Sequence, residues 1–278
     1  MAWNGAASFA QSESGTRSLW VWRTALSESA DVVAFAHRNR IRTVFLSIPA
    51  DDRAALEAGA ATPLLALRAF GSAGLALYCV AGDPSWVERT RVDPPDTVQQ
   101  LLAVHATHGI FEGLALDVEP HTLPGWKDDG RKAALAQNYL ALLTLIQSAA
   151  GVLNTPVLAT VHPTYAKYTP PTGTGETLLQ TVARTVDATD LMAYRNSEKT
   201  LESFAGAAME QLAGIAKPWW LGVSTHPNSP PGTSYATLPG ARFFHAIDAT
   251  AADLAQRYPG SFQGISVEDY RNTVALVG

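Results

Sequence analysis

The chain has 278 residues, of which 47% are hydrophobic and 16% are charged, and its formal net charge is −5. This composition supplies a large apolar core and excludes a disordered chain. The mild acidity and the lack of any Lys/Arg run predict that neither a nucleic acid nor a membrane surface is a partner. A chain of this length fits one large domain.

The start of the chain is small, polar and nearly uncharged, and we interpret residues 1–17 as a flexible segment before a single domain at 18–278. It lacks the basic and apolar stretches of a signal peptide, although a chain whose leader had been removed would look the same. No run approaches the roughly 18 apolar residues that span a bilayer. We therefore expect a soluble, cytoplasmic protein. Cys79 is the single cysteine, in an apolar run, and is predicted to be a small buried hydrophobe.

Short β-branched or aromatic segments alternate along the chain with longer Ala/Leu-rich amphipathic segments. In chain order, strands are predicted at 19–24, 43–48, 75–80, 113–118, 156–162, 190–194, 219–224 and 264–267. Helical segments are predicted between them at 29–39, 51–70, 96–108, 131–149, 176–185, 201–215 and 246–257.

This alternation predicts a parallel sheet with crossover helices. Several strands are apolar on both faces, which favours a single (β/α)8 TIM barrel. The alternative is a doubly wound open sheet, but no Gly-rich phosphate-binding motif follows the first strand. The Pro/Gly-rich stretches at 169–175 and 227–240 follow the fifth and seventh strands, so we interpret them as loops of the active face.

Two acidic residues, Asp117 and Glu119, end the predicted fourth strand just before Pro120. Strand side chains alternate with period two, so both carboxyls are expected to face the same way, at the barrel end that carries catalytic groups. Two close carboxylates repel each other, and one of them tends to keep a proton at neutral pH. We therefore predict that Glu119 is a general acid/base and that Asp117 orients it. The alternative is that both are solvated or salt-bridged charges at a strand end.

The predicted eighth strand offers a second carboxylate. Ser266 and Glu268 share one face by parity, which we take to be the inner one, and strands four and eight lie on opposite sides of a barrel. Glu268 is thus predicted to oppose Glu119 across a bound ligand, and two opposed carboxyls are what glycoside hydrolysis requires. The alternative for Glu268 is an ion pair with Arg195 or Arg271.

Several further residues are predicted to bind substrate because they stand at the ends of strands or in the loops that follow. Indole faces stack on sugar rings, guanidinium groups pair with carboxylates, and imidazoles also bind metals. No His-x-His or His-Glu-x-x-His spacing is present, so we expect no metal and no cofactor. The alternative is a structural role for each histidine and a place in the core for each tryptophan. The predicted substrate-binding residues are Arg195, His162, His226, Trp22, Trp126 and Trp220.

The segment 112–119 resembles the fourth-strand motif of glycoside hydrolase family 18, the chitinases and their relatives, written Asp-Gly-x-Asp-x-Asp-x-Glu. Asp117 matches its last aspartate and Glu119 its catalytic acid, whereas Glu112-Gly113 matches the opening pair loosely. The segment Met192-Ala193-Tyr194-Arg195 resembles that family's Met-x-Tyr-Asp, whose tyrosine helps to hold the reacting N-acetyl group. The resemblance implies a barrel glycosidase in which Tyr194 contacts the substrate. It extends to uncharacterised bacterial glycosidase-like barrels with a Leu-Asp-Val-Glu-Pro strand.

Three positions depart from the family pattern. Ala115 replaces the middle aspartate, Arg195 replaces the aspartate after the tyrosine, and Glu268 stands about where the family has a sugar-stacking tryptophan. These departures favour hydrolysis by two protein carboxylates over assistance from an N-acetyl group. We predict a glycosidase-like hydrolase of a small molecule or oligosaccharide. The alternatives are a metal-dependent lyase or isomerase acting on a small polar substrate, and a carbohydrate-binding barrel without catalysis.

Overall fold

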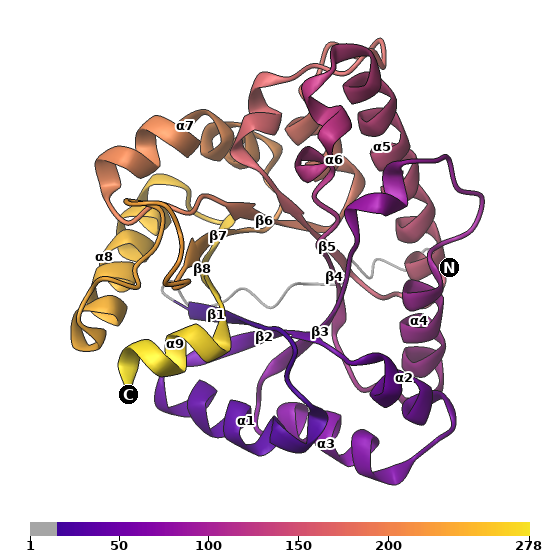
Figure 1. Ribbon diagram of the computed structural model, residues 1–278, viewed down its shortest axis with the longest axis vertical. Coiled ribbons are helices and arrows are strands. Elements are labelled where there is room, and N and C mark those ends of the chain that lie inside the picture. The colour runs from indigo at the N-terminus through magenta and orange to yellow at the C-terminus, as the bar shows by residue number, and fades with distance from the viewer. Residues whose placement is uncertain (1–15) are drawn as a thin grey trace.

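The computed structural model describes residues 16–278, and its strands form a closed parallel barrel in the order β1 to β8 (Figure 1). β8 pairs with β1, so the open doubly wound sheet is excluded and the predicted TIM barrel is confirmed. The strands are β1 (Thr16–Val21), β2 (Ile41–Ser47), β3 (Ala76–Ala81), β4 (Gly113–Leu116), β5 (Val157–Val161), β6 (Ala188–Met192), β7 (Trp219–Ser224) and β8 (Phe262–Glu268).

Thr16 and Arg17, which the predicted boundary at 17/18 leaves in the flexible segment, already belong to β1 and pair with Gly264 and Ile265 of β8. The predicted flexible segment 1–17 otherwise lies outside the described residues.

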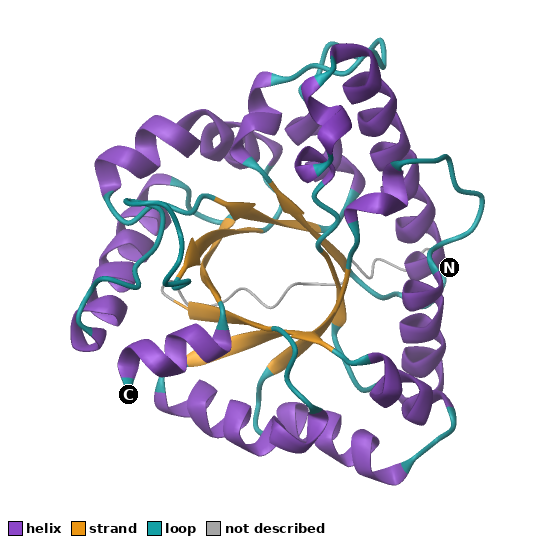
Figure 2. Ribbon diagram, in the orientation of Figure 1, coloured by secondary structure: helices purple, strands orange, loops and turns teal. Residues whose placement is uncertain are grey.

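Helices surround the barrel as an outer ring (Figure 2). The segment 51–70, predicted as one helical run, forms two helices that separate near Gly59, whose φ of +74° is incompatible with a continuing right-handed helix. In the described part of the chain no helix combines the length and apolarity that a membrane crossing needs. The helices are α1 (Ser29–Arg38), α2 (Ala50–Glu57), α3 (Ala61–Ser72), α4 (Asp96–His108), α5 (Asp129–Gly151), α6 (Leu178–Thr185), α7 (Glu198–Ile215), α8 (Gly240–Arg257) and α9 (Tyr270–Val277).

The apolar core has two layers, which follow from the period-two alternation of the strands. The larger layer lies between the sheet and the helices and includes Cys79, which is fully buried as predicted. The smaller layer fills the barrel interior, where the inward-facing strand positions meet; its buried members are Trp20, Phe45, Tyr78, Val80, Ala115, Leu158, Ala188 and Trp220.

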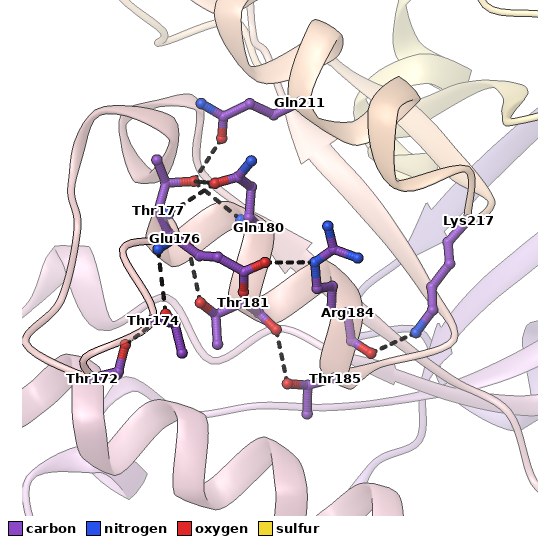
Figure 3. A network of polar contacts seen from close by, with 10 residues as sticks. All are labelled: Thr172, Thr174, Glu176, Thr177, Gln180, Thr181, Arg184, Thr185, Gln211 and Lys217. Atoms are coloured by element: carbon purple, nitrogen blue, oxygen red, sulfur yellow. Dashed lines mark hydrogen bonds and ion pairs between the residues drawn. The ribbon is translucent and has the colours of Figure 1, made fainter.

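A polar network links the end of the Pro/Gly-rich loop after β5 to the helices that follow it (Figure 3). Thr177 caps α6 in a capping box with Gln180, and its hydroxyl also donates to Gln211 of α7 at 2.6 Å. Arg184 pairs with Glu176 at 2.7 Å, and Lys217 donates to the Arg184 carbonyl at 2.6 Å. The Thr177–Gln211 bond joins the start of α6 to α7, and the Lys217 bond joins the end of α6 to the segment after α7.

Candidate active site

A cavity of about 700 Å³ opens at the end of the barrel where the strands finish. It lies above the apolar interior layer, and its walls come from the C-terminal ends of β1, β4, β5, β6, β7 and β8 and from the start of α9. The lining residues are Trp20, Trp22, Arg23, Asp117, Glu119, Thr160, Asp190, Met192, Tyr194, Gly222, His226, Ser266, Glu268, Asp269, Arg271 and Asn272.

Asp117 is the first residue after β4, and its neighbours fix its place in the wall. Its backbone N–H donates to the Ala81 carbonyl at 3.0 Å, which extends the β3–β4 pairing by one residue. Gly82 must lack a side chain, because a Cβ there would lie 1.9 Å from the carbonyl oxygen of Asp117. The Thr160 hydroxyl donates to Asp117 Oδ1 at 2.8 Å. Burial raises the pKa of Asp117, and the bond from Thr160 opposes this shift.

Glu119 reaches the same cavity by a different route from the one that strand parity suggests. β4 ends at Leu116, and Glu119 adopts the left-handed conformation, with φ 50° and ψ 55°. A non-glycine residue in this region is strained by about 1–3 kcal/mol. The Thr122 backbone N–H and hydroxyl hold the turn, donating to the Glu119 carbonyl at 3.0 and 2.9 Å. The Glu119 carboxyl therefore lies in the cavity because of a strained turn after β4, not because of its position on a strand.

The electrostatics of Glu119 favour its protonated form. Burial, followed by the negative charges of Asp117 and Glu268, raises its pKa to about 8. A carboxyl with such a pKa is largely protonated at neutral pH and can donate a proton to a leaving group.

Glu268 ends β8, across the barrel from β4 (Figure 1). Its carboxylate accepts a hydrogen bond from the Tyr194 hydroxyl, and in the described part of the chain it forms no ion pair. Burial raises the pKa of Glu268 to about 7, against the lowering effect of the Tyr194 bond. The two expected cationic partners are engaged elsewhere: Arg271 pairs with Glu28 at 3.1 Å, and Arg195 donates to the Tyr194 carbonyl at 2.6 Å.

Asp269, next to Glu268, caps α9 by accepting from the Asn272 backbone N–H at 2.9 Å. Its side chain therefore serves the helix layer.

Sequence reasoning did not single out Asp190, which forms the floor of the cavity. It is 1% exposed. Its Oδ2 accepts from Trp20 Nε1 at 2.9 Å and from Ser266 Oγ at 2.6 Å. Burial raises its pKa to about 6, and the Ser266 and Trp20 bonds oppose that rise. The sequence gives one hint of a role in the site, an aspartate at the start of a predicted strand between Thr189 and apolar residues. A structural role explains that placement equally well.

The predicted sugar-contacting tryptophans fall into two groups. Trp22 lines the cavity and stacks on Trp20, with ring centroids 5.5 Å apart. Trp220 points inward, but it is buried in the apolar interior layer beneath the cavity. Trp126 is half-buried outside the cavity wall, where it contacts Tyr165 at a centroid distance of 5.7 Å. Of the three, only Trp22 is placed for stacking on a ligand in this cavity.

The predicted basic contacts also separate. His226 lines the cavity at its exposed rim. His162 and Arg195 pack beside the cavity around Phe204, with the Arg195 guanidinium 3.7 Å from the ring centroid. Burial and the charge of Arg195 lower the pKa of His162 to about 4, so this imidazole is neutral at pH 7. His121, which sequence reasoning missed, stacks on His162 at 4.3 Å.

In residues 16–278 no group of three or more His, Cys, Asp or Glu side chains is arranged to hold a metal ion.

No family model and no curated protein matches the sequence. Solved structures do match in fold. A chitinase from Chromobacterium violaceum aligns with a TM-score of 0.54 at 12% identity, covering 95% of this chain and 98% of that one. A class V chitinase from Pseudomonas fluorescens gives 0.54 at 15%, covering 95% and 98%. A glycoside hydrolase family 18 chitinase from Cycas revoluta in complex with (GlcNAc)4 gives 0.55 at 11%, covering 95% and 97%.

These likenesses show that the chain has the barrel fold of family 18 chitinases over nearly its whole length. At such identities they show the fold alone.

Proposed function

We propose that this protein is a glycoside hydrolase of the family 18-like type, with its active site in the cavity at the barrel mouth. The observation that carries the proposal is the pairing of Glu119 and Glu268. Two carboxyls from opposite sides of the barrel line one cavity, with pKa values raised to about 8 and about 7. Groups shifted toward neutrality in a cleft are typical of acid/base catalysts.

In the proposed reaction, Glu119 donates its proton to the glycosidic oxygen while the bond to the anomeric carbon breaks. Asp117 supports this role, since its charge raises the pKa of Glu119 and thereby keeps the acid protonated. Glu268 in its ionised form is the second carboxylate, facing the developing positive charge of the sugar ring. Tyr194 stabilises that ionised form through its hydrogen bond. Water then forms the new bond to the anomeric carbon and gives its proton to a carboxylate of the site, which completes the hydrolysis.

Three further observations support a sugar substrate. The cavity volume suits a ligand of a few hundred Å³, one wall carries the stacked Trp20–Trp22 pair, and indole faces bind sugar rings. Structures of the Cycas revoluta chitinase hold (GlcNAc)3 and (GlcNAc)4. We extend an oligosaccharide substrate to this chain as part of the proposal, with His226 and Trp22 as substrate contacts.

The predicted alternative of a carbohydrate-binding barrel without catalysis has a specific observation in its favour. Ala115, in the interior layer, replaces the middle aspartate of the family motif, so one acidic group of that motif is missing. Binding of an oligosaccharide without any cleavage during long incubation would support this alternative.

The test is hydrolysis by Glu119→Gln, assayed first on wild-type protein against a panel of aryl glycosides and soluble oligosaccharides. We expect turnover of the cleaved substrate to fall by about 10²–10⁴-fold, because the acid is removed while the shape is kept. Glu112→Gln is the matched control, since Glu112 lies in the same segment but is exposed. Unchanged turnover in Glu119→Gln would reject the proposal.

A further inference from the structure

One oxygen of the cavity floor is left without a partner. Asp190 Oδ2 receives two hydrogen bonds, but Oδ1, equally buried, receives none from the described residues. A buried carboxylate oxygen is costly unless it is hydrogen-bonded or paired with a cation. Asp190 therefore retains an acceptor that its own surroundings do not use.

A glycine, Gly222, lies next to Oδ1 at the edge of the cavity. A Cβ placed on Gly222 would lie 3.3 Å from Asp190 Oδ1, and Gly222 itself lines the cavity. A side chain at this position would crowd Oδ1 and also the Leu191 carbonyl oxygen, which would lie 3.2 Å from the same Cβ. Met192, the β6 neighbour that pairs with Gly222, also lines the cavity, so this corner belongs to the ligand space.

The charge of the cavity indicates what kind of donor suits this oxygen. Four carboxyl groups face it, those of Asp117, Glu119, Asp190 and Glu268, against two guanidinium groups; a fifth acidic residue in the wall, Asp269, uses its carboxyl to cap α9. Both guanidinium groups lie at the rim: Arg23 is exposed, and the Arg271 side chain is 57% exposed and paired with Glu28. Thr160 donates to Asp117, and Ser266 and Trp20 donate to Asp190, whereas Trp22 Nε1 in the cavity wall has no partner among the described residues. The floor is thus acidic and lacks a cation of its own.

We infer that Asp190 Oδ1 is a recognition point for a primary ammonium group, so that the substrate class is a glycan containing an amino sugar with a free amine. This inference rests on the proposed function only in taking the ligand to be a carbohydrate. An ammonium bound here forms a charge-assisted hydrogen bond with Asp190 and lies close to the charge of Asp117. An N-acetylated sugar at the same position would bind less tightly than the free amine. Its amide offers one neutral N–H in place of a charged ammonium, and its acyl group must fit beside Met192 and Gly222.

The experiment measures binding, so that it does not depend on turnover. Glu119→Gln protein is titrated calorimetrically at about pH 6.5, where sugar amines are protonated. The probes are three β-1,4-linked trimers, of glucosamine, of N-acetylglucosamine and of glucose. We expect the glucosamine trimer to bind about tenfold or more tightly than either neutral trimer, which is the usual strength of one charge-assisted bond.

Adding Asp190→Asn tests the residue. Asparagine keeps an acceptor oxygen and removes the charge, so the preference for the glucosamine trimer should disappear while affinity for the glucose trimer changes less than about twofold. Gly222→Ala provides a second variant that leaves the charge in place and narrows access to Oδ1, and it should reduce the same preference. Thermal melts establish that both variants are folded.

Equal affinities for the three trimers, or a glucosamine preference that survives Asp190→Asn in folded protein, would overturn the inference. Equal weakening of all three trimers by Asp190→Asn would also overturn it, because that result indicates a structural role. A different result would reject the proposed function while leaving this inference in place: the glucosamine trimer would bind selectively, and the wild-type protein would cleave no glycan.

Discussion

The two halves of the barrel interior use the same inward-facing strand positions for opposite purposes. The lower half is a packed apolar layer in which Phe45 contacts Trp20 at 4.6 Å, Tyr78 at 5.8 Å and Trp220 at 6.3 Å between ring centroids. The upper half, one or two residues further along the strands, carries carboxyls around a cavity. Burial of apolar side chains in the lower half stabilises the barrel. The carboxyl groups buried in the upper half destabilise the fold, and the same burial shifts their pKa values.

Asp190 and Trp20 join the two halves. Trp20 packs in the lower layer and donates its indole N–H upward to Asp190. Substitutions on either side of this boundary should therefore have separable effects, those above on catalysis and those below on stability.

The largest separable effect is expected above the boundary, at Glu268. Glu268→Gln removes the proposed second carboxylate while keeping its shape, and on that proposal we expect kcat to fall by about 10²–10⁴-fold. The melting temperature should stay the same or rise, since a buried acidic group has been removed. Asp253→Asn, on the exposed face of α8, is the control. An unchanged kcat in Glu268→Gln would contradict the view that the upper half of the interior serves catalysis and the lower half serves stability.

Below the boundary, Phe45→Ala should destabilise the fold by about 3–5 kcal/mol, because it empties the centre of the aromatic layer. Chemical denaturation measures this loss, and Phe45→Leu should recover part of it. The fraction that remains folded should keep the wild-type pH profile of kcat/KM. A changed profile would show that the lower layer tunes the carboxyls as well as supporting them.

A smaller effect is expected for Tyr194→Phe. The Tyr194 hydroxyl stabilises ionised Glu268 and so lowers its pKa. Removing the hydroxyl raises that pKa above about 7, so Glu268 ionises later and the acidic limb of the kcat/KM profile moves to higher pH. We expect about a tenfold loss of rate at neutral pH. An acidic limb that stays in place would show that this limb belongs to another group.

The fold was largely predictable because eight apolar segments at regular spacing leave few other arrangements. The sequence also placed Asp117, Glu119 and Glu268 at the ends of strands that meet in one cavity. It did not reveal how Glu119 arrives there, because period-two alternation assumes a strand that in fact ends at Leu116.

Depth along the barrel was the other limit of the prediction. Trp220 and Trp20 both face inward, yet only Trp20 reaches the cavity, because strand stagger sets the height of each residue. The bonds of Asp190 connect it to residues 170 and 76 positions away in the chain. Strand parity alone does not bring such partners together, so Asp190 could be recognised only from the folded barrel.

The central claim is that Glu119 holds a proton at neutral pH, and carbon NMR titration of protein labelled at the glutamate side-chain carboxyls tests it without any substrate. The spectrum of Glu119→Gln identifies the resonance. The structure predicts a midpoint of about 8, from burial and from the charges of Asp117 and Glu268. Because these groups titrate together, Glu268→Gln should lower that midpoint. A Glu119 resonance that titrates near the ordinary glutamate value of about 4.3 would contradict the assignment of this residue as the general acid.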